Sequence, residues 1–177
     1  IYGQVFADTS RVDSGVAEVY RLDEYDNSFY LVDSVDIISN DSLYISYYRF
    51  DNLLFGDFLV KVKLKQSSSI YNSFAPSYSG YAYKWNLADT VLLDTMLINI
   101  PVNLINIENS IGNSTISGYV LQGSKKAPGD PVGGIMLYLT NSSGDVFDFA
   151  YSNKISGYYE FDNIDLETYY VYADIIN

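Results

Sequence analysis

Residues that could do catalytic chemistry are scarce in this chain, because its 177 residues include no His and no Cys. Without His the usual general base, the His-containing triads and the commonest transition-metal ligand are missing. Without Cys there are no disulfides or thiolate zinc sites. Ser and Thr lack a conventional activating base. Carboxylate pairs could cleave glycosides in principle, but acids in turns between short strands share no cleft. The sequence therefore predicts a protein that is not an enzyme.

The strongest candidate for a binding site is the aromatic segment Tyr71–Trp85. Its partner-binding residues would be Tyr78, Tyr81, Tyr83 and Trp85. The last three share one side if the backbone is extended, and aromatic faces can stack on sugar rings or fill a protein pocket. Polar side chains that could orient a ligand are Asn72, Asn86 and Asp89. The alternative is that the segment buries its rings as a cap over one end of the fold.

Paired acids in turns are candidate calcium ligands, since calcium prefers oxygen donors. The pairs are Asp8 with Asp13, Asp23 with Asp26, and Asp162 with Asp165. No stretch has the Asp-x-Asp-x-Asp-Gly spacing of a calcium loop. Turn formation and solubility explain these residues adequately. We therefore expect no cofactor and no metal site, with a structural calcium ion at a module junction as the alternative.

The composition favours a strand-rich globular protein. Hydrophobic residues make up 48% of the chain, which has 19 Tyr and 9 Phe, as is typical of β-sheets. The 22 acidic and 10 basic residues give a net charge of −12, which repels nucleic acid and anionic membranes. No apolar stretch approaches membrane-spanning length. Since the chain opens at Ile1 without Met or a signal sequence, it looks like a segment of something longer.

Two stretches of the chain are nearly the same. Residues 47–60 match residues 158–171 without a gap, with identity at six of fourteen positions. Strand alternation places the second Tyr and the Phe of each copy inward: Tyr48, Phe50, Tyr159 and Phe161. The Asp-Asn that follows is expected to turn the chain, because both side chains tolerate unusual dihedrals. Two copies of one building block are typical of an extended array.

Short β-rich runs separated by turn residues surround both copies of the motif. In the first block the expected strands are Ile1–Phe6, Val16–Leu22, Phe29–Val35 and Phe58–Leu64. In the second block they are Ile116–Val120, Ile135–Leu139, Val146–Tyr151 and Tyr169–Ile175, with turn residues at 125–131. This order predicts an all-β fold made of antiparallel sandwiches.

The first block has one further strand, Ile98–Leu104, whose alternate residues are apolar. Pro101 cannot donate a ladder hydrogen bond, so we expect an edge strand. The second block has no counterpart of this strand. We therefore expect it to lack its last strand, which would lie beyond Asn177 or be donated by another chain.

The polar, turn-rich stretch 108–115 is the natural boundary between modules. It predicts module 1 at residues 1–107, with an aromatic insertion at residues 66–95. Residues 108–115 are the linker, and module 2 is the incomplete sandwich at residues 116–177.

Both blocks share the order Ile-x-Gly-x-Val, a turn, a strand and Tyr-x-Phe-Asp-Asn-Leu/Ile. This order resembles the carboxypeptidase-regulatory-like and collagen-adhesin B-type modules, which are small Ig-like or transthyretin-like β-sandwiches. Residues 126–132 and 78–85 look like tandem modules of giant Bacteroidetes surface proteins exported by type IX secretion. The resemblance implies a secreted, extracellular protein of the cell surface, whose modules serve as spacers and adhesive stalks.

Many collagen-adhesin B-type modules carry an internal Lys–Asn isopeptide bond, which needs a Lys facing the core on the first strand. Residues 1–6 and 116–121 contain no Lys. Lys125 and Lys126 are expected in the adjacent solvated turn. No isopeptide bond is therefore expected.

These observations predict a structural or adhesive stalk module of a large repetitive surface protein, serving adhesion, a surface filament or gliding. Expected partners are the neighbouring modules, other protomers through exposed strand edges, and a glycan or protein on a target surface, without nucleic acid or membrane insertion. The alternative is a carbohydrate-binding accessory module of a secreted enzyme. In that case the rings of Tyr78–Trp85 should form a solvent-facing platform.

Overall fold

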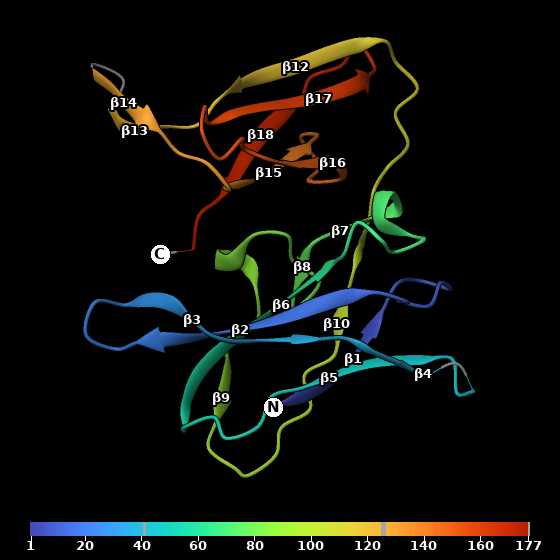
Figure 1. The fold of residues 1–177 in the computed structure, drawn as a ribbon, viewed down its shortest axis with the longest axis vertical. Coiled ribbons are helices and arrows are strands. Elements are labelled where there is room, and N and C mark those ends of the chain that lie inside the picture. Colours follow the sequence, from blue (N-terminus) through green and yellow to red (C-terminus); the bar gives the residue numbers. More distant parts are fainter. Residues whose placement is uncertain (41, 125–126, 177) are drawn as a thin grey trace. The chain divides into compact units, whose positions relative to one another are not determined.

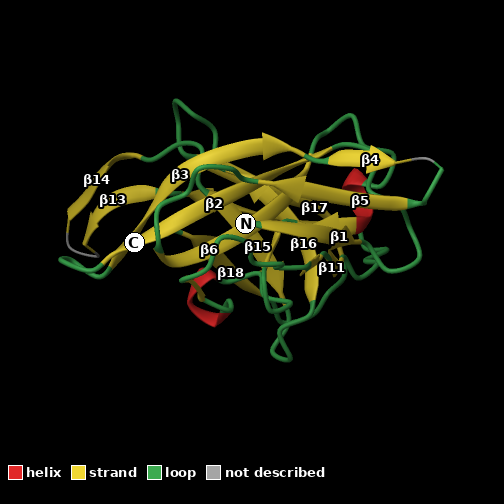
Figure 2. Ribbon diagram, turned by 90° about the horizontal axis from the view of Figure 1, so that it is seen from below, coloured by secondary structure: helices red, strands yellow, loops and turns green. Residues whose placement is uncertain are grey.

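The computed structural model describes residues 1–40, 42–124 and 127–176. Its regular secondary structure is almost wholly β-strand, with short 3-10 helices at η1 (Tyr71–Ser73) and η2 (Trp85–Leu87) (Figures 1 and 2). Within the described ranges, no helix has the length and apolar character needed to cross a membrane. The predicted all-β fold class is confirmed.

The chain divides into two compact units, residues 1–106 and residues 107–175. The predicted linker 108–115 differs from this division, because it belongs to the second unit. The amide of Glu108 donates to the carbonyl of Val146 (2.7 Å), and the amide of Gly112 donates to that of Asn163 (3.1 Å). The polar backbone of this stretch is thus satisfied by the second unit.

The first unit is a sandwich of two sheets, one in the order β10-β1-β5-β4 and the other in the order β3-β2-β6-β8, with β9 paired to β6 (Figure 1). The strands of the first sheet are β1 (Tyr2–Phe6), β4 (Ile38–Asn40), β5 (Ile45–Arg49) and β10 (Val102–Asn103). Those of the second are β2 (Gly15–Asp23), β3 (Ser28–Asp36), β6 (Gly56–Leu64), β8 (Ser77–Tyr78) and β9 (Val91–Leu93). A separate short pair joins β7 (Phe74–Ala75) to β11 (Ile105–Asn106).

The core of the first unit follows from strand alternation. Tyr48 and Phe50 are 0% and 2% exposed, as predicted, while Arg49 between them is exposed. The predicted edge strand also has its apolar residues inside, since Ile100, Val102 and Leu104 all belong to the buried cluster. Burial of such side chains contributes about 1.5–3 kcal/mol each.

This edge segment, residues 98–104, which includes β10 and is called the closing strand below, pairs with β1 in parallel, with Val5 opposite Val102. We predicted antiparallel sandwiches, and this parallel pairing of β1 with the closing strand, called the seam below, is the exception. It is held by backbone bonds from Tyr2 to the Ile98 carbonyl (3.0 Å), from Ile100 to the Tyr2 carbonyl (2.8 Å) and from Leu104 to the Phe6 carbonyl (2.8 Å). The closing strand therefore occupies the edge of the sheet, as Pro101 indicated.

The buried Tyr48 side chain connects β5 to the closing strand by a hydrogen bond. The hydroxyl of Tyr48 donates to the carbonyl of Ile100 (2.5 Å), and burial raises the pKa of Tyr48 far above its ordinary value. A Cβ on Gly3 would overlap the same carbonyl and crowd the hydroxyl. Only glycine therefore lets the tyrosine, β1 and the closing strand approach so closely.

The second unit repeats part of this plan. One sheet pairs β12 (Ser114–Tyr119) with β17 (Tyr158–Ile164), and the other has the order β16-β15-β18. The strands of the latter are β15 (Met136–Thr140), β16 (Val146–Tyr151) and β18 (Tyr170–Asp174). Leu137, Leu139, Phe161 and Ile164 form the buried cluster. Phe161 faces inward as predicted, and Tyr159 packs against this cluster while half-buried.

Two local predictions were wrong. The turn expected at residues 125–131 is instead part of a hairpin, in which β13 (Leu121–Ser124) pairs with β14 (Ala127–Pro131); Lys125 and Lys126 lie outside the described residues. The Asp-Asn of the second copy does not end its strand, since β17 continues to Ile164. Asn163 nevertheless has a left-handed φ of 61°, close to the 57° of Asn52 in the first copy, as Asn tolerates.

The seam yields a test by Tyr48→Phe. Removing the hydroxyl leaves the buried Ile100 carbonyl without its donor, so the first unit should lose about 1–2 kcal/mol of unfolding free energy. Hydrogen exchange resolved to each unit, combined with urea unfolding, would measure the loss. The matched control is Tyr159→Phe in the second unit, which should cost less. Equal losses in the two variants would contradict the role given to this hydrogen bond.

Candidate functional site

The aromatic segment is anchored by Tyr78, which is fully buried on β8. Tyr78 pairs with Lys61 on β6, and the Lys61 Nζ lies 4.9 Å from the centre of the Tyr78 ring. Such a cation over a ring face is stabilising, most strongly away from water. Tyr78 therefore packs in the first unit and presents no ring to solvent.

The remaining three rings do not share one side. Tyr81 has a left-handed φ of 57°, and Trp85 begins a 3-10 helix, so the segment is not extended. Trp85 is half-buried and meets Phe29 edge to face, at 6.2 Å between ring centres. Tyr83 is also half-buried, and only Tyr81 is exposed, at 58%. This geometry favours packing over a flat platform of four rings.

Tyr81 lines an open cavity of about 360 Å³ together with Ser79, Asp89, Asn99 and Asn103. Asp89 is held in place by Ser79, whose hydroxyl donates to the Asp89 carbonyl (2.9 Å). The Asp89 amide donates in turn to the Ser79 carbonyl (3.1 Å). The cavity thus combines one exposed ring with carboxylate, amide and hydroxyl groups, a lining that suits a polar ligand with an apolar face.

Sequence reasoning singled out Tyr81 and Asp89 but missed Asn99 and Asn103. Both belong to the predicted strand Ile98–Leu104 and occupy its outward positions, because the alternate residues are apolar. The alternation therefore contained a signal for their exposure. The alternation does not predict that this strand lies beside Tyr81.

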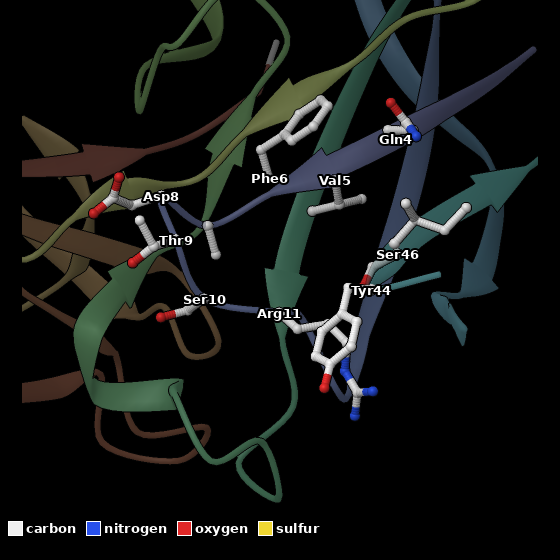
Figure 3. Close-up of a pocket in the computed structure, with 11 residues that line it drawn as sticks. Gln4, Val5, Phe6, Asp8, Thr9, Ser10, Arg11, Tyr44 and Ser46 are labelled. Atoms are coloured by element: carbon white, nitrogen blue, oxygen red, sulfur yellow. The ribbon is translucent and has the colours of Figure 1, made fainter. Parts of the chain in front are cut away.

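A second cavity, of about 250 Å³, lies where β1 leads into the loop at residues 7–11 (Figure 3). Figure 3 shows Asp8, Thr9 and Ser10 along this loop, with Arg11 and Tyr44 at another part of the rim. Ser46 in its lining is already bonded to the carbonyl of Val12 (2.7 Å). The cavity is smaller than most small-molecule sites, and Asp8, a candidate calcium ligand, is the one residue of its lining that the sequence singled out.

Most of the paired acids accept hydrogen bonds, either within their own turn or from a segment distant in sequence. Asp23 and Asp26 accept the amides of Tyr25 (2.9 Å) and Ser28 (3.0 Å) within their own turn. In the second unit, Asp162 accepts from the Thr115 hydroxyl (2.7 Å) and Asp165 from the Ile111 amide (3.3 Å). Among the residues that the structure describes, no group of three or more His, Cys, Asp or Glu could hold a metal ion.

Asp13 ties a distant loop to the start of β2. Its carboxylate accepts the Ser68 hydroxyl (2.5 Å) and the Ser69 amide (3.0 Å). The hydrogen bond from Ser68, supported by that from Ser69, lowers the pKa of Asp13 to about 2. Asp8, its predicted calcium partner, is exposed and has a left-handed φ of 49°. The role of Asp13 in this geometry is to fasten the loop.

No protein-family model matches the chain, and no curated protein matches it either. Among solved structures, it is similar to a point mutant of the shaft pilin SpaA from Lactobacillus rhamnosus GG, with 11% sequence identity and a TM-score of 0.31. That comparison covers 99% of this chain and 86% of the pilin chain. A TM-score this low establishes neither a shared fold nor a shared function.

The lowered pKa of Asp13 predicts a pH dependence of stability. An unfolded Asp titrates near pH 3.9, so the stabilisation by this carboxylate is complete above about pH 4 and is lost as the pH falls toward about 2. Because Asp13 is partly exposed, the effect should stay below about 1 kcal/mol. Asp13→Asn should therefore flatten the fall in unfolding free energy between pH 4 and 2. Urea unfolding at each pH measures it, and an unchanged slope would contradict the assignment.

Proposed function

We propose that this chain is part of the stalk of a large repetitive cell-surface protein, in which sandwich modules hold a binding element away from the cell. It works by shape and stiffness, without catalysis. The duplication supports this proposal. Gly3 pairs with Tyr48 in the first unit, and Gly118 pairs with Tyr159 in the second, in the same register of the duplicated sequence. Modules repeated in series suit a structural array.

The observation that carries the proposal is the parallel seam of the first unit. β1 begins next to Ile1, the first residue of this unit, and the closing strand, which runs parallel to β1, ends next to Asn106. Tension applied at Ile1 and Asn106 therefore pulls the two strands in opposite directions along their length. The seam hydrogen bonds lie across this force and share it, whereas an antiparallel hairpin pulled at its open end loses its bonds one at a time.

The side chains at the seam add to its resistance. Sliding β1 past its partner would break the bond between the Tyr48 hydroxyl and the Ile100 carbonyl. It would also withdraw Val5 and Val102, which are both buried, from the core. These are the interactions expected of a module that bears tension in a stalk.

The finer assignment rests on the sequence. Resemblance to carboxypeptidase-regulatory-like and collagen-adhesin B-type modules supports an extracellular adhesive protein, and resemblance to Bacteroidetes surface proteins supports export by type IX secretion. The net charge of −12 keeps a long extracellular chain soluble. Its natural partners are then the neighbouring modules and a glycan or protein on the target surface.

Single-molecule pulling tests this proposal. The chain contains no Cys, so introduced cysteines give unique attachment points. Pulled through its two termini, the chain should show separate unfolding of the two units, and the first should resist the higher force. The second has no described parallel partner for β12.

The matched control pulls the same unit across a hairpin, through Val16→Cys and Asp36→Cys on the paired ends of β2 and β3. This geometry separates one pair of residues at a time, so the force should be clearly lower. If the first unit yields through its termini as easily as through the hairpin, the stalk proposal is wrong.

A second candidate function is carbohydrate binding at the Tyr81 cavity. The exposed Tyr81 ring could stack on a sugar, while Asp89 and Asn99 lie in the same lining to bind hydroxyl groups. A glycan array would then show selective binding by the wild type that falls roughly tenfold in Tyr81→Ala. The control is Tyr25→Ala, since Tyr25 is 99% exposed in a turn outside the cavity. No selective binding, or equal losses in both variants, would exclude this candidate.

A further inference from the structure

Tyr44 has a backbone conformation that is uncommon for a bulky residue. Its φ of 52° lies in the left-handed region, which Asn and Asp tolerate but which is strained for a large side chain. The Tyr44 side chain is 82% exposed, so the packing of the core does not require a tyrosine at this position. Residues held in such strained conformations cluster at binding sites. The Tyr44 ring is therefore a candidate ligand contact.

The other left-handed residues support this reading of Tyr44. Among the described residues, those besides glycine are Asp8, Asn27, Tyr44, Asn52, Tyr81 and Asn163. Tyr81 shares with Tyr44 the property of being neither Asn nor Asp, and it lines the cavity considered above for carbohydrate. Tyr44 lines the cavity at the end of β1, and Asp8 lines it too. Two left-handed residues, from the loop after β1 and from the turn before β5, thus shape one cavity.

The walls of this cavity are held by hydrogen bonds within the unit. In the loop after β1, the Ser10 amide donates to the carbonyl of Ala7 (2.8 Å), and Ala7 itself is fully buried. Ser46, which lines the cavity from β5, donates from its hydroxyl to the carbonyl of Val12 (2.7 Å). This bond ties the end of the loop to β5. The cavity is therefore preformed, which lowers the entropic cost of binding a ligand.

The chemical groups of the lining suit a sugar that carries a carboxylate. Arg11 and Tyr44 lie at the same part of the rim (Figure 3). A guanidinium binds a carboxylate through two parallel hydrogen bonds, and its five donors can serve more than one acceptor. The Tyr44 ring can stack on the apolar face of a sugar. Thr9 and Ser10 are exposed and carry hydroxyls. The charge of Asp8 repels a carboxylate, which favours the orientation toward Arg11.

We propose that this cavity binds a single sugar residue that carries a carboxylate, such as a uronic acid at the end of a glycan. Arg11 holds the carboxylate, and the Tyr44 ring stacks on the sugar. The volume of about 250 Å³ is below the range of most ligand sites and suits one ring. The net charge of −12 opposes non-specific binding of anions, so binding depends on this local arrangement. The site is independent of the mechanical role proposed above.

Methyl β-glucuronide is the probe, and methyl β-glucoside, which has a hydroxymethyl group in place of the carboxylate, is its matched control. In an NMR titration of the full chain, the glucuronide should shift the backbone amides of Thr9, Ser10 and Ile45 saturably. The glucoside should bind about tenfold more weakly, because it lacks the charge-assisted bonds to Arg11. Acetate, a carboxylate without a ring, should also bind more weakly. Absence of saturable shifts at about 50 mM glucuronide, or equal binding of the acidic and the neutral sugar, would overturn the proposal.

Two substitutions locate the site. Tyr44→Gly removes the ring and relieves the left-handed strain, so it should weaken glucuronide binding about tenfold without lowering the stability to urea. Arg11→Gln should reduce glucuronide binding to the level of the glucoside, whereas its matched control Arg49→Gln on β5 should leave it unchanged. Tyr81→Ala should also leave it unchanged, because Tyr81 lines the other cavity. If Tyr44→Gly binds as the wild type does, or if Arg49→Gln or Tyr81→Ala loses as much affinity as Arg11→Gln, the sugar does not bind in this cavity.

Discussion

The structure of the first unit depends on one close approach, in which β1, the Tyr48 ring and the closing strand converge over Gly3. The hydroxyl of Tyr48 reaches the Ile100 carbonyl only because position 3 has no side chain. That hydrogen bond is buried, so its loss would leave a desolvated carbonyl. The buried Val102 fixes the register beside it. The closing strand therefore covers the core, pairs with β1 and accepts the Tyr48 hydroxyl at the same time.

The second unit has every part of this arrangement except the last. Gly118, Tyr159 and the register between β12 and β17 are all present, yet the space over them is not covered by a described strand of this unit. Its buried cluster is accordingly small, with Leu137, Leu139, Phe161 and Ile164 at its centre. A sandwich with an open edge and a half-exposed core is poorly protected against unwanted pairing. The difference between the units thus concerns completeness, since both follow the same plan.

The strands were largely predictable because alternation reports burial directly, as at Tyr48, Phe50 and Phe161. The direction of pairing was not, because parallel and antiparallel strands present the same alternation to a core. The hairpin of β13 and β14 was hidden for another reason: its Gly, Pro and Lys residues have the composition of a turn. At the candidate site, an aromatic-rich run does not distinguish buried rings from exposed ones. The left-handed backbone at Tyr81 bends the segment, so Tyr78 is buried while Tyr81 is exposed.

The position of the closing strand along the chain has a kinetic consequence. β1 and β5 are separated by about forty residues, but Val5 meets Val102 only after almost the whole unit has been made. Contacts between residues so far apart in sequence slow folding, because the loop entropy is lost before the contact can stabilise anything. One edge of β1 therefore has no partner until residues 98–104 have been made. Any group that pairs with this edge earlier must leave before residues 98–104 can take its place.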